Sequence, residues 1–218
     1  MIYKKQRMLL TNRLKNIAKN LYRDRDSSHG LIHVYKVRDN AMNICKKLNI
    51  TDPNVLIKIE SAALFHDLWD HKYIHSSSSK YIEIKNNFRN KLKEENFSDH
   101  DIKDIEIIID NVSLSREIEY RKNDKVLNLK HLQLMRDIVS DADKLEMLGK
   151  NGISRIIKFQ EYKRPDTKPE ELNFIIKKVY VEKISKLLKE NYIKTKPAKD
   201  MAEPLMLEMN EYIKNIKD

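Results

Sequence analysis

Apolar residues recur every three or four positions along most of the chain, which is the period of an amphipathic α-helix. The expected helices cover residues 3–22, about 28–48, 53 to about 67, 80–96, 98–112, 130–148, 170–191 and 198–216. Residues 111–124 give mixed signals and are expected to form a loop or a short helix. The polar run 162–169 is expected to link the helical core to the last two helices. The pattern therefore predicts an all-α fold.

The helix that begins at Pro53 carries an adjacent histidine and aspartate into the core. Asp52 is its expected cap, and proline is favoured at a first helical position. Its apolar face is formed by Val55, Ile59, Ala62 and His66. Burying His66 and Asp67 costs free energy unless they find partners. A metal ion is one such partner, because imidazole nitrogen and carboxylate oxygen suit divalent cations. A core histidine that bonds another protein group, beside a helix-terminal aspartate, is the commoner explanation when the pair is taken alone, so the pair by itself does not establish a metal site.

The stretch 130–148 carries a second set of candidate ligands. Its inward-facing stripe is expected to be Leu134, Ile138, Ala142, Leu145 and Gly149. Asp141 and Asp143 flank this stripe, either as ligands or as solvated residues of a helix edge. Gly149 and Gly152 predict close helix contact or backbone approach nearby.

Two histidines lead the apolar stripe of the helix at 28–48. His29 and His33 are one turn apart, so both lie on the face that later becomes apolar. Either one is an interior hydrogen-bonding group or a metal ligand.

Composition narrows the class of protein. The 218 residues include only three glycines and five prolines, which favours long helices. One cysteine excludes an internal disulfide framework, and no apolar run reaches the roughly 18 residues of a membrane span. We therefore expect a cytoplasmic protein without membrane partners.

The net charge of +10 favours an anionic partner, but the lysines are spread among acidic residues, so dedicated nucleic-acid binding is not expected.

Taken together, His33, the pair His66-Asp67 and Asp143 resemble the H…HD…D signature of the HD-domain superfamily of metal-dependent phosphohydrolases. The resemblance prefers His33 over His29 because His33 stands in a His-Val-x-x-Val segment. It prefers Asp143 over Asp141 because Asp143 stands in an Ala-Asp-x-Leu segment. The chain also resembles single-domain bacterial-type members in its run Asp141-Ala142-Asp143-Lys144-Leu145-Glu146-Met147-Leu148-Gly149-Lys150-Asn151-Gly152-Ile153-Ser154-Arg155 and in Lys186-Leu187-Leu188.

The resemblance implies an HD-domain helical bundle with a C-terminal helical extension, in a single domain over 1–218. The core would cover about 23–160 and the C-terminal helical pair about 170–216. The implied activity is hydrolysis of a phosphoester or phosphoanhydride, with a nucleotide as the expected small-molecule substrate. The rival hypothesis is a non-catalytic, metal-containing protein that binds nucleotide or nucleic acid.

The resemblance also assigns roles at the site. His33, His66, Asp67 and Asp143 would hold one divalent ion, and two imidazoles favour Mn²⁺, Fe²⁺ or Ni²⁺ over Mg²⁺. Asp70 would act beside Asp67 as the general acid or base. Lys72 and Arg155 would bind phosphate, or would serve as structural ion-pair partners. Relatives often carry a His-Ser-Phe-Ser segment where this chain has Val112-Ser113-Leu114-Ser115, which favours a single metal.

Overall fold

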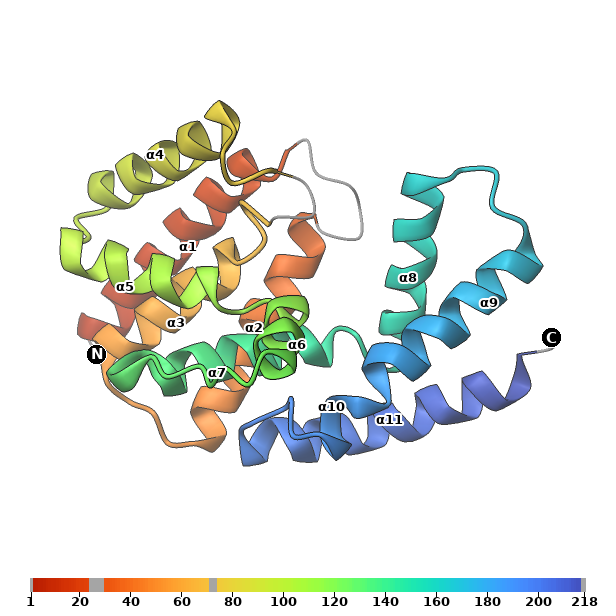
Figure 1. Cartoon of the computed structure of the whole chain (residues 1–218). Helices are drawn as coiled ribbons and strands as arrows, with labels where there is room; N and C mark the ends of the chain where they lie inside the picture. The colour runs from red at the N-terminus through yellow and green to blue at the C-terminus, as the bar shows by residue number, and fades with distance from the viewer. Residues whose placement is uncertain (1, 24–29, 71–73, 217–218) are drawn as a thin grey trace.

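The chain folds into helices joined by short connections in a computed structural model that describes residues 2–23, 30–70 and 74–216 (Figure 1). Within these ranges no residue belongs to a strand, so the all-α prediction is confirmed. The first seven helices are α1 (Ile2–Leu21), α2 (Leu31–Lys47), α3 (Pro53–Phe65), α4 (Ser79–Glu94), α5 (Asp99–Asp110), α6 (Leu114–Lys122) and α7 (Gln133–Leu145). The remaining ones are α8 (Gly149–Lys163), α9 (Pro169–Val179), α10 (Lys186–Lys189) and α11 (Lys196–Asn215).

Two of the predicted helix starts are confirmed by their caps. The Asp52 carboxylate accepts a hydrogen bond from the Asn54 backbone N–H at 2.8 Å, directly before Pro53. Ser98 Oγ accepts from the Asp101 backbone N–H at 3.1 Å and opens α5. Each cap satisfies a backbone donor that the first helical turn leaves without an intrahelical partner.

The core forms where α2, α3 and α7 pack together, with α1 and α5 against α3. Ala62 and Ala63 of α3 and Ala142 of α7 are completely buried, and their small side chains allow these helices to approach closely. The prediction that Leu134 faces inward is wrong, because its side chain is 51% exposed. Leu132 occupies the core position at this end, from a 3₁₀ turn that precedes α7.

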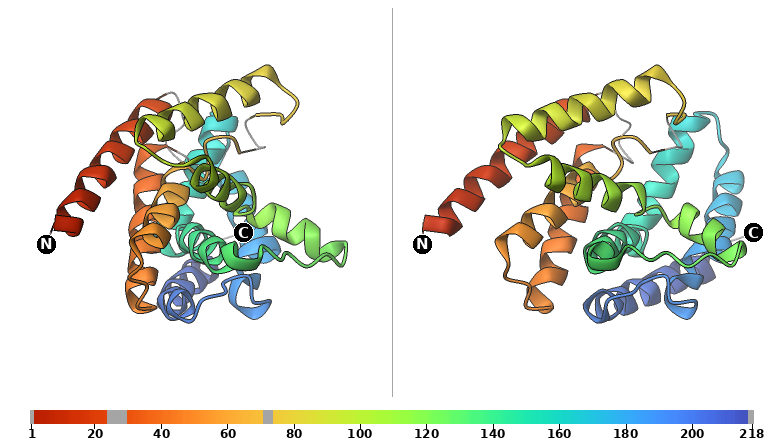
Figure 2. Two further views of the ribbon diagram at one scale, coloured as in Figure 1. Left: turned by 90° about the vertical axis from the view of Figure 1, so that its left-hand side faces the viewer. Right: turned by 60° about the vertical axis from the view of Figure 1, so that its left-hand side comes forward.

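The C-terminal helices form the second part of the fold. In Figures 1 and 2, α8 and α9 lie side by side and rise from α11, and α8 packs against both. The predicted single helix over 170–191 is interrupted, since α9 runs into a π-helical turn, Tyr180–Ile184, before α10. Pro204 lies inside α11, which packs against α7 and α8.

The two predicted glycine contacts are confirmed. Gly149 has a φ of +60°, a left-handed conformation, and a Cβ there would collide with the Glu208 carboxylate of α11. A Cβ on Gly152 would collide with the Met147 backbone carbonyl. Both positions therefore require glycine, and they set the close approach of α8 to α11 and to the end of α7.

None of the helices in the described part of the chain is both long and apolar enough to span a bilayer.

Candidate metal centre and active-site cleft

Four side chains from three helices converge at one point: His33 on α2, His66 and Asp67 at the end of α3, and Asp143 on α7. His33 Nε2 lies 3.2 Å from His66 Nε2, 3.4 Å from Asp67 Oδ2 and 3.3 Å from Asp143 Oδ1. His66 Nε2 lies 3.4 Å from the same Asp67 oxygen and 3.6 Å from the same Asp143 oxygen. Packing of α2, α3 and α7 thus joins residues that are up to 110 positions apart.

The end of α3 explains how adjacent residues can face the same point. On a regular helix, neighbouring side chains point about 100° apart. Here α3 ends at Phe65, directly before the pair and close to the predicted end, and His66 to Trp69 form turns in which the Leu68 N–H donates to the Phe65 carbonyl. Both His66 and Asp67 are only 6% exposed. The turn therefore directs both side chains into the same buried cluster.

Hydrogen bonding fixes the orientation of His66. Its Nδ1 lies 2.9 Å from the Ala63 carbonyl oxygen, which can only accept, so Nδ1 carries the proton. Nε2 then faces the cluster, and in the neutral ring it offers a lone pair.

The charges within the cluster are strongly coupled. Burial lowers the pKa of His66, but the Asp67 and Asp143 carboxylates outweigh it and raise that pKa to about 9. Burial alone would raise the pKa of Asp143, yet the two histidines hold it well below its usual range. A cation is therefore favoured among these groups, and a metal ion would take the place of the imidazolium proton.

The donor set fits a divalent ion. His33, His66 and Asp143 offer ligand atoms that lie within 4.8 Å of one another. Atoms bound about 2.0–2.2 Å from one ion lie about 3–3.6 Å apart, which matches the separations among the four side chains. Two imidazole nitrogens and two carboxylate oxygens suit borderline metals. Asp141 points elsewhere, and its carboxylate accepts from the backbone N–H groups of Lys194 and Thr195.

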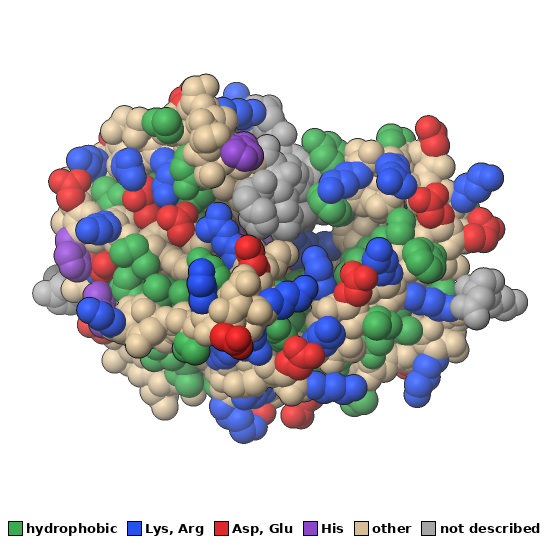
Figure 3. All heavy atoms as spheres, in the orientation of Figure 1, with side chains coloured by type: hydrophobic (Ala, Val, Ile, Leu, Met, Phe, Trp, Pro, Cys, Tyr) green, Lys and Arg blue, Asp and Glu red, His purple; other side chains and the backbone are tan. Residues whose placement is uncertain are grey.

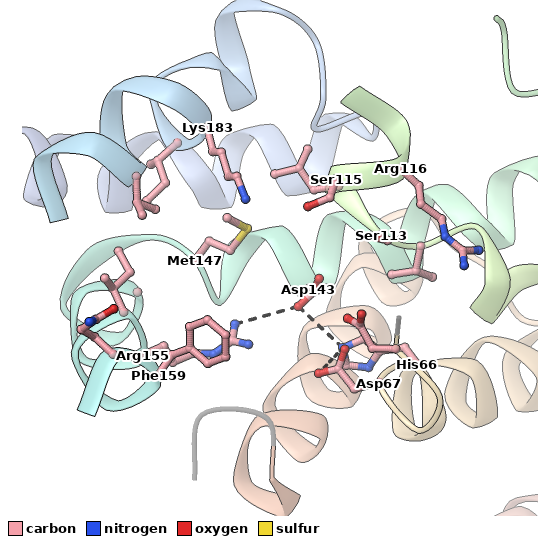
Figure 4. Close-up of a pocket in the computed structure, with 18 of the residues that line it drawn as sticks. His66, Asp67, Ser113, Ser115, Arg116, Asp143, Met147, Arg155, Phe159 and Lys183 are labelled. Atoms are coloured by element: carbon pink, nitrogen blue, oxygen red, sulfur yellow. Dashed lines mark ion pairs between the residues drawn. The ribbon is translucent and has the colours of Figure 1, made fainter. Parts of the chain in front are cut away.

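The cluster lies at the base of a cleft of about 350 Å³ between the core and the C-terminal helices (Figure 4). Two predicted residues line it besides His66, Asp67 and Asp143. Asp70 lies at the end of the turn that carries His66 and Asp67. Arg155 projects from α8, with Nη2 3.2 Å from His33 Nε2 and Nη1 3.9 Å from Asp143. Lys72 lies outside the described residues.

Several cleft residues were not predicted from the sequence. The first turn of α6 contributes Ser113, Ser115 and Arg116, although residues 111–124 gave no clear helical pattern. Lys183 enters from the π-helical turn, a conformation that periodicity does not reveal. The apolar wall of the cleft includes Ile156, Phe159, Ile175 and Val179. Lys and Arg side chains gather around the hollow between the two parts of the molecule (Figure 3).

A buried ionic network holds α6 against α7 beside the cleft. The Glu117 carboxylate accepts from Arg136 Nη2 at 2.9 Å and from Lys144 Nζ at 3.0 Å. Arg136 Nε also donates to the Asn111 carbonyl, and Ser140 Oγ donates to the Val112 carbonyl. These bonds fix the segment that leads into the cleft-lining turn of α6.

Comparison with solved structures places the chain in the fold of HD-superfamily hydrolases and confirms the predicted resemblance at the level of fold. A structure from Bacillus thuringiensis described as an HD-superfamily hydrolase is 22% identical with a TM-score of 0.65, and the match covers 95% of each chain. Bacillus subtilis YpgQ in complex with ADP is 22% identical with a TM-score of 0.65, and the match covers 94% of each chain. A Lactobacillus plantarum protein is 19% identical with a TM-score of 0.67, again over 94% of each chain. No protein-family model and no curated protein sequence matches the chain.

Proposed function

We propose that the protein is a metal-dependent phosphohydrolase that cleaves a phosphoester or phosphoanhydride bond of a nucleotide. The observation that carries this proposal is the convergence of His33, His66, Asp67 and Asp143 at the base of a cleft that Arg155 also enters. The HD-superfamily hydrolase fold supports a hydrolase, and the ADP complex of YpgQ supports a nucleotide.

The four clustered side chains would hold one divalent ion. When bound, such an ion acidifies a water molecule and polarises a phosphoryl group. Mn²⁺, Fe²⁺ and Ni²⁺ fit the two imidazoles better than Mg²⁺, which prefers oxygen ligands. Because His66 Nδ1 is held by the Ala63 carbonyl, the ring reaches the ion in a single orientation.

Other residues of the cleft position the substrate and move protons. The Arg155 guanidinium beside the cluster would bind phosphate oxygens through two N–H groups. Asp70 lines the cleft at the end of the turn that carries His66 and Asp67, and it would transfer the proton to or from the reacting oxygen. The apolar wall that contains Phe159 would cover the nucleoside, whose base stacks favourably on an aromatic ring.

A screen of released products tests the proposal. Metal-stripped protein would be given Mn²⁺, Fe²⁺, Ni²⁺ or Mg²⁺ with nucleoside mono-, di- and triphosphates, and phosphate and pyrophosphate would be measured. Turnover should require metal and disappear in Asp67→Ala. Stoichiometric metal binding without turnover of any nucleotide would instead support a metal-containing binding protein.

Asp70→Ala separates the proton-transfer role from metal binding. Loss of a general acid or base should lower kcat by about 10²–10⁴-fold while the protein still binds metal. Unchanged kcat on every phosphate substrate would exclude this role for Asp70.

A further inference from the structure

Arg116 lies on the wall of the cleft and has no ion-pair partner among the described residues. Its one hydrogen bond to the described residues runs from Nη1 to the Asp110 backbone carbonyl at 2.9 Å. A guanidinium has five N–H donors, so most of its donors remain available in the cleft. The side chain is half-buried and belongs to the surface that encloses the candidate site.

The neighbouring carboxylate does not neutralise Arg116. The Asp110 side chain accepts from Trp69 Nε1 at 2.7 Å and from Lys85 Nζ at 3.1 Å. Lys85 also lies over the Trp69 ring, 4.7 Å from its centroid. The charge of Asp110 is therefore already balanced by Lys85, and the Asp110 carboxylate does not pair with Arg116.

The position of Arg116 on its helix is electrostatically unfavourable. It is the third residue of α6, where the helix dipole favours anions and disfavours cations. Glu117, the acidic residue of this turn, is already engaged by Arg136 and Lys144. A cation in the first turn of a helix beside a cleft, with no compensating ion pair in the described part of the chain, is typical of a functional position.

Arg116 and Arg155 lie on opposite sides of the His66, Asp67 and Asp143 group in Figure 4. Arg155 contacts the cluster itself, whereas Arg116 shares no ion pair with it. Arg155 therefore places a cation at the metal centre and Arg116 places one at α6, in addition to Lys183 from the π-helical turn.

We propose that Arg116 binds a phosphoryl group of the substrate other than the one held at the metal centre. The cleft then selects substrates that carry at least two phosphoryl groups, because a monophosphate held at the metal centre leaves Arg116 without a phosphoryl group to bind. A guanidinium suits this role because its planar fork matches phosphate oxygens. This inference rests on the proposed nucleotide phosphohydrolase function and adds a residue that decides specificity.

The test compares binding of α,β-methylene-ADP, which resists cleavage of its phosphate bridge, with binding of AMP to the Mn²⁺-loaded protein. Trp69 is the one tryptophan of the chain and lines the cleft, so its fluorescence reports binding, and calorimetry confirms the dissociation constants. Arg116→Ala should weaken the diphosphate analogue about 10–100-fold, the range expected for lost hydrogen bonds between charged groups. Binding of AMP should change by less than about threefold.

Matched variants test whether weaker binding results from a general loss of positive charge or from unfolding rather than from the loss of Arg116. Lys122→Ala removes one positive charge from an exposed position of the same helix, outside the cleft, and should change neither affinity. Arg116→Lys keeps the charge but loses the fork, and should fall between wild type and Arg116→Ala. Thermal unfolding of all variants shows whether the fold is retained.

The outcomes separate the two proposals. Equal weakening of both ligands by Arg116→Ala, or no weakening of either, would overturn the role of Arg116. A wild-type protein that prefers the diphosphate analogue through Arg116, yet hydrolyses no nucleotide, would overturn the proposed activity and leave the binding role standing. Failure of the wild-type protein to bind either ligand would overturn both.

Discussion

Asp141 and Asp143 lie two residues apart on α7, and their carboxylates serve different parts of the molecule. Asp143 Oδ1 lies 3.3 Å from His33 Nε2, whereas Asp141 Oδ2 accepts from the Thr195 backbone N–H at 2.7 Å and from its hydroxyl at 2.8 Å. The first carboxylate faces the candidate metal centre. The second fixes the connection that leads into α11.

Because the two carboxylates have different partners, we expect matched substitutions to affect different properties: metal affinity for Asp143 and fold stability for Asp141. Asp143→Asn should weaken Mn²⁺ binding at least about tenfold, because it removes a charged ligand. Asp141→Asn should leave metal affinity near the wild-type value and lower the free energy of unfolding by about 1–3 kcal/mol. Calorimetric titration with Mn²⁺ and urea unfolding of the metal-free proteins measure the two effects. Loss of metal affinity in Asp141→Asn alone would exclude this assignment.

Glu117 makes the free energy of unfolding depend on pH in the acid range. Burial raises the pKa of Glu117, but Lys144 and Arg136 outweigh it and lower the pKa from 4.5 to about 2. A carboxyl group with a depressed folded-state pKa stabilises the fold fully above its unfolded value and loses this contribution as pH falls from about 4.5 to about 2. Glu117→Gln should therefore cost about 3 kcal/mol at pH 7, and the difference from wild type should shrink through that window. Urea unfolding at pH 7, 5, 4 and 3 measures it, and a difference that stays constant with pH would contradict the prediction.

Two features of the structure require glycine at position 149: the backbone is left-handed there, and a side chain would collide with a neighbour. With φ at +60°, an alanine at this position is strained by about 1–2 kcal/mol, and its Cβ also meets the Glu208 carboxylate. Gly149→Ala should lower the free energy of unfolding by at least this amount. Adding Glu208→Ala should relieve the collision but not the backbone strain, so the double variant should remain less stable than Glu208→Ala alone. Equal stability of those two proteins would show that the backbone strain is absent.

Lys183 brings a positive charge to the cleft from the π-helical turn. Short π-helical segments often occur at functional sites, because the extra residue changes the direction of the side chains around it. Lys183→Met should weaken binding of α,β-methylene-ADP about tenfold through loss of this charge. Lys186→Met removes an exposed charge one turn later, outside the cleft, and should have no effect. Equal behaviour of the two variants would exclude a role for Lys183 in the cleft.

The local features of the fold could be predicted because their causes lie within a few residues. The start of α3 depends on Asp52 and Pro53, and the start of α5 depends on Ser98. The turn that follows α3 could not be predicted, since the apolar pattern continues through Leu68 and Trp69 while the backbone leaves the helix at Phe65. Leu134 was misplaced for a related reason, because a residue of the preceding turn fills the core at that end.

By itself, the sequence determined that the protein is helical, where most helices lie, and which histidines and aspartates were candidates for a shared site. These properties follow from side-chain spacing and from capping, which act over one or two helical turns. Only the tertiary structure decided that Asp143 rather than Asp141 faces the histidines, and that Arg116 and Lys183 line the same cleft as Asp67. Such relationships depend on how helices distant in the chain pack against one another, and no local pattern records the direction in which a side chain points across that packing.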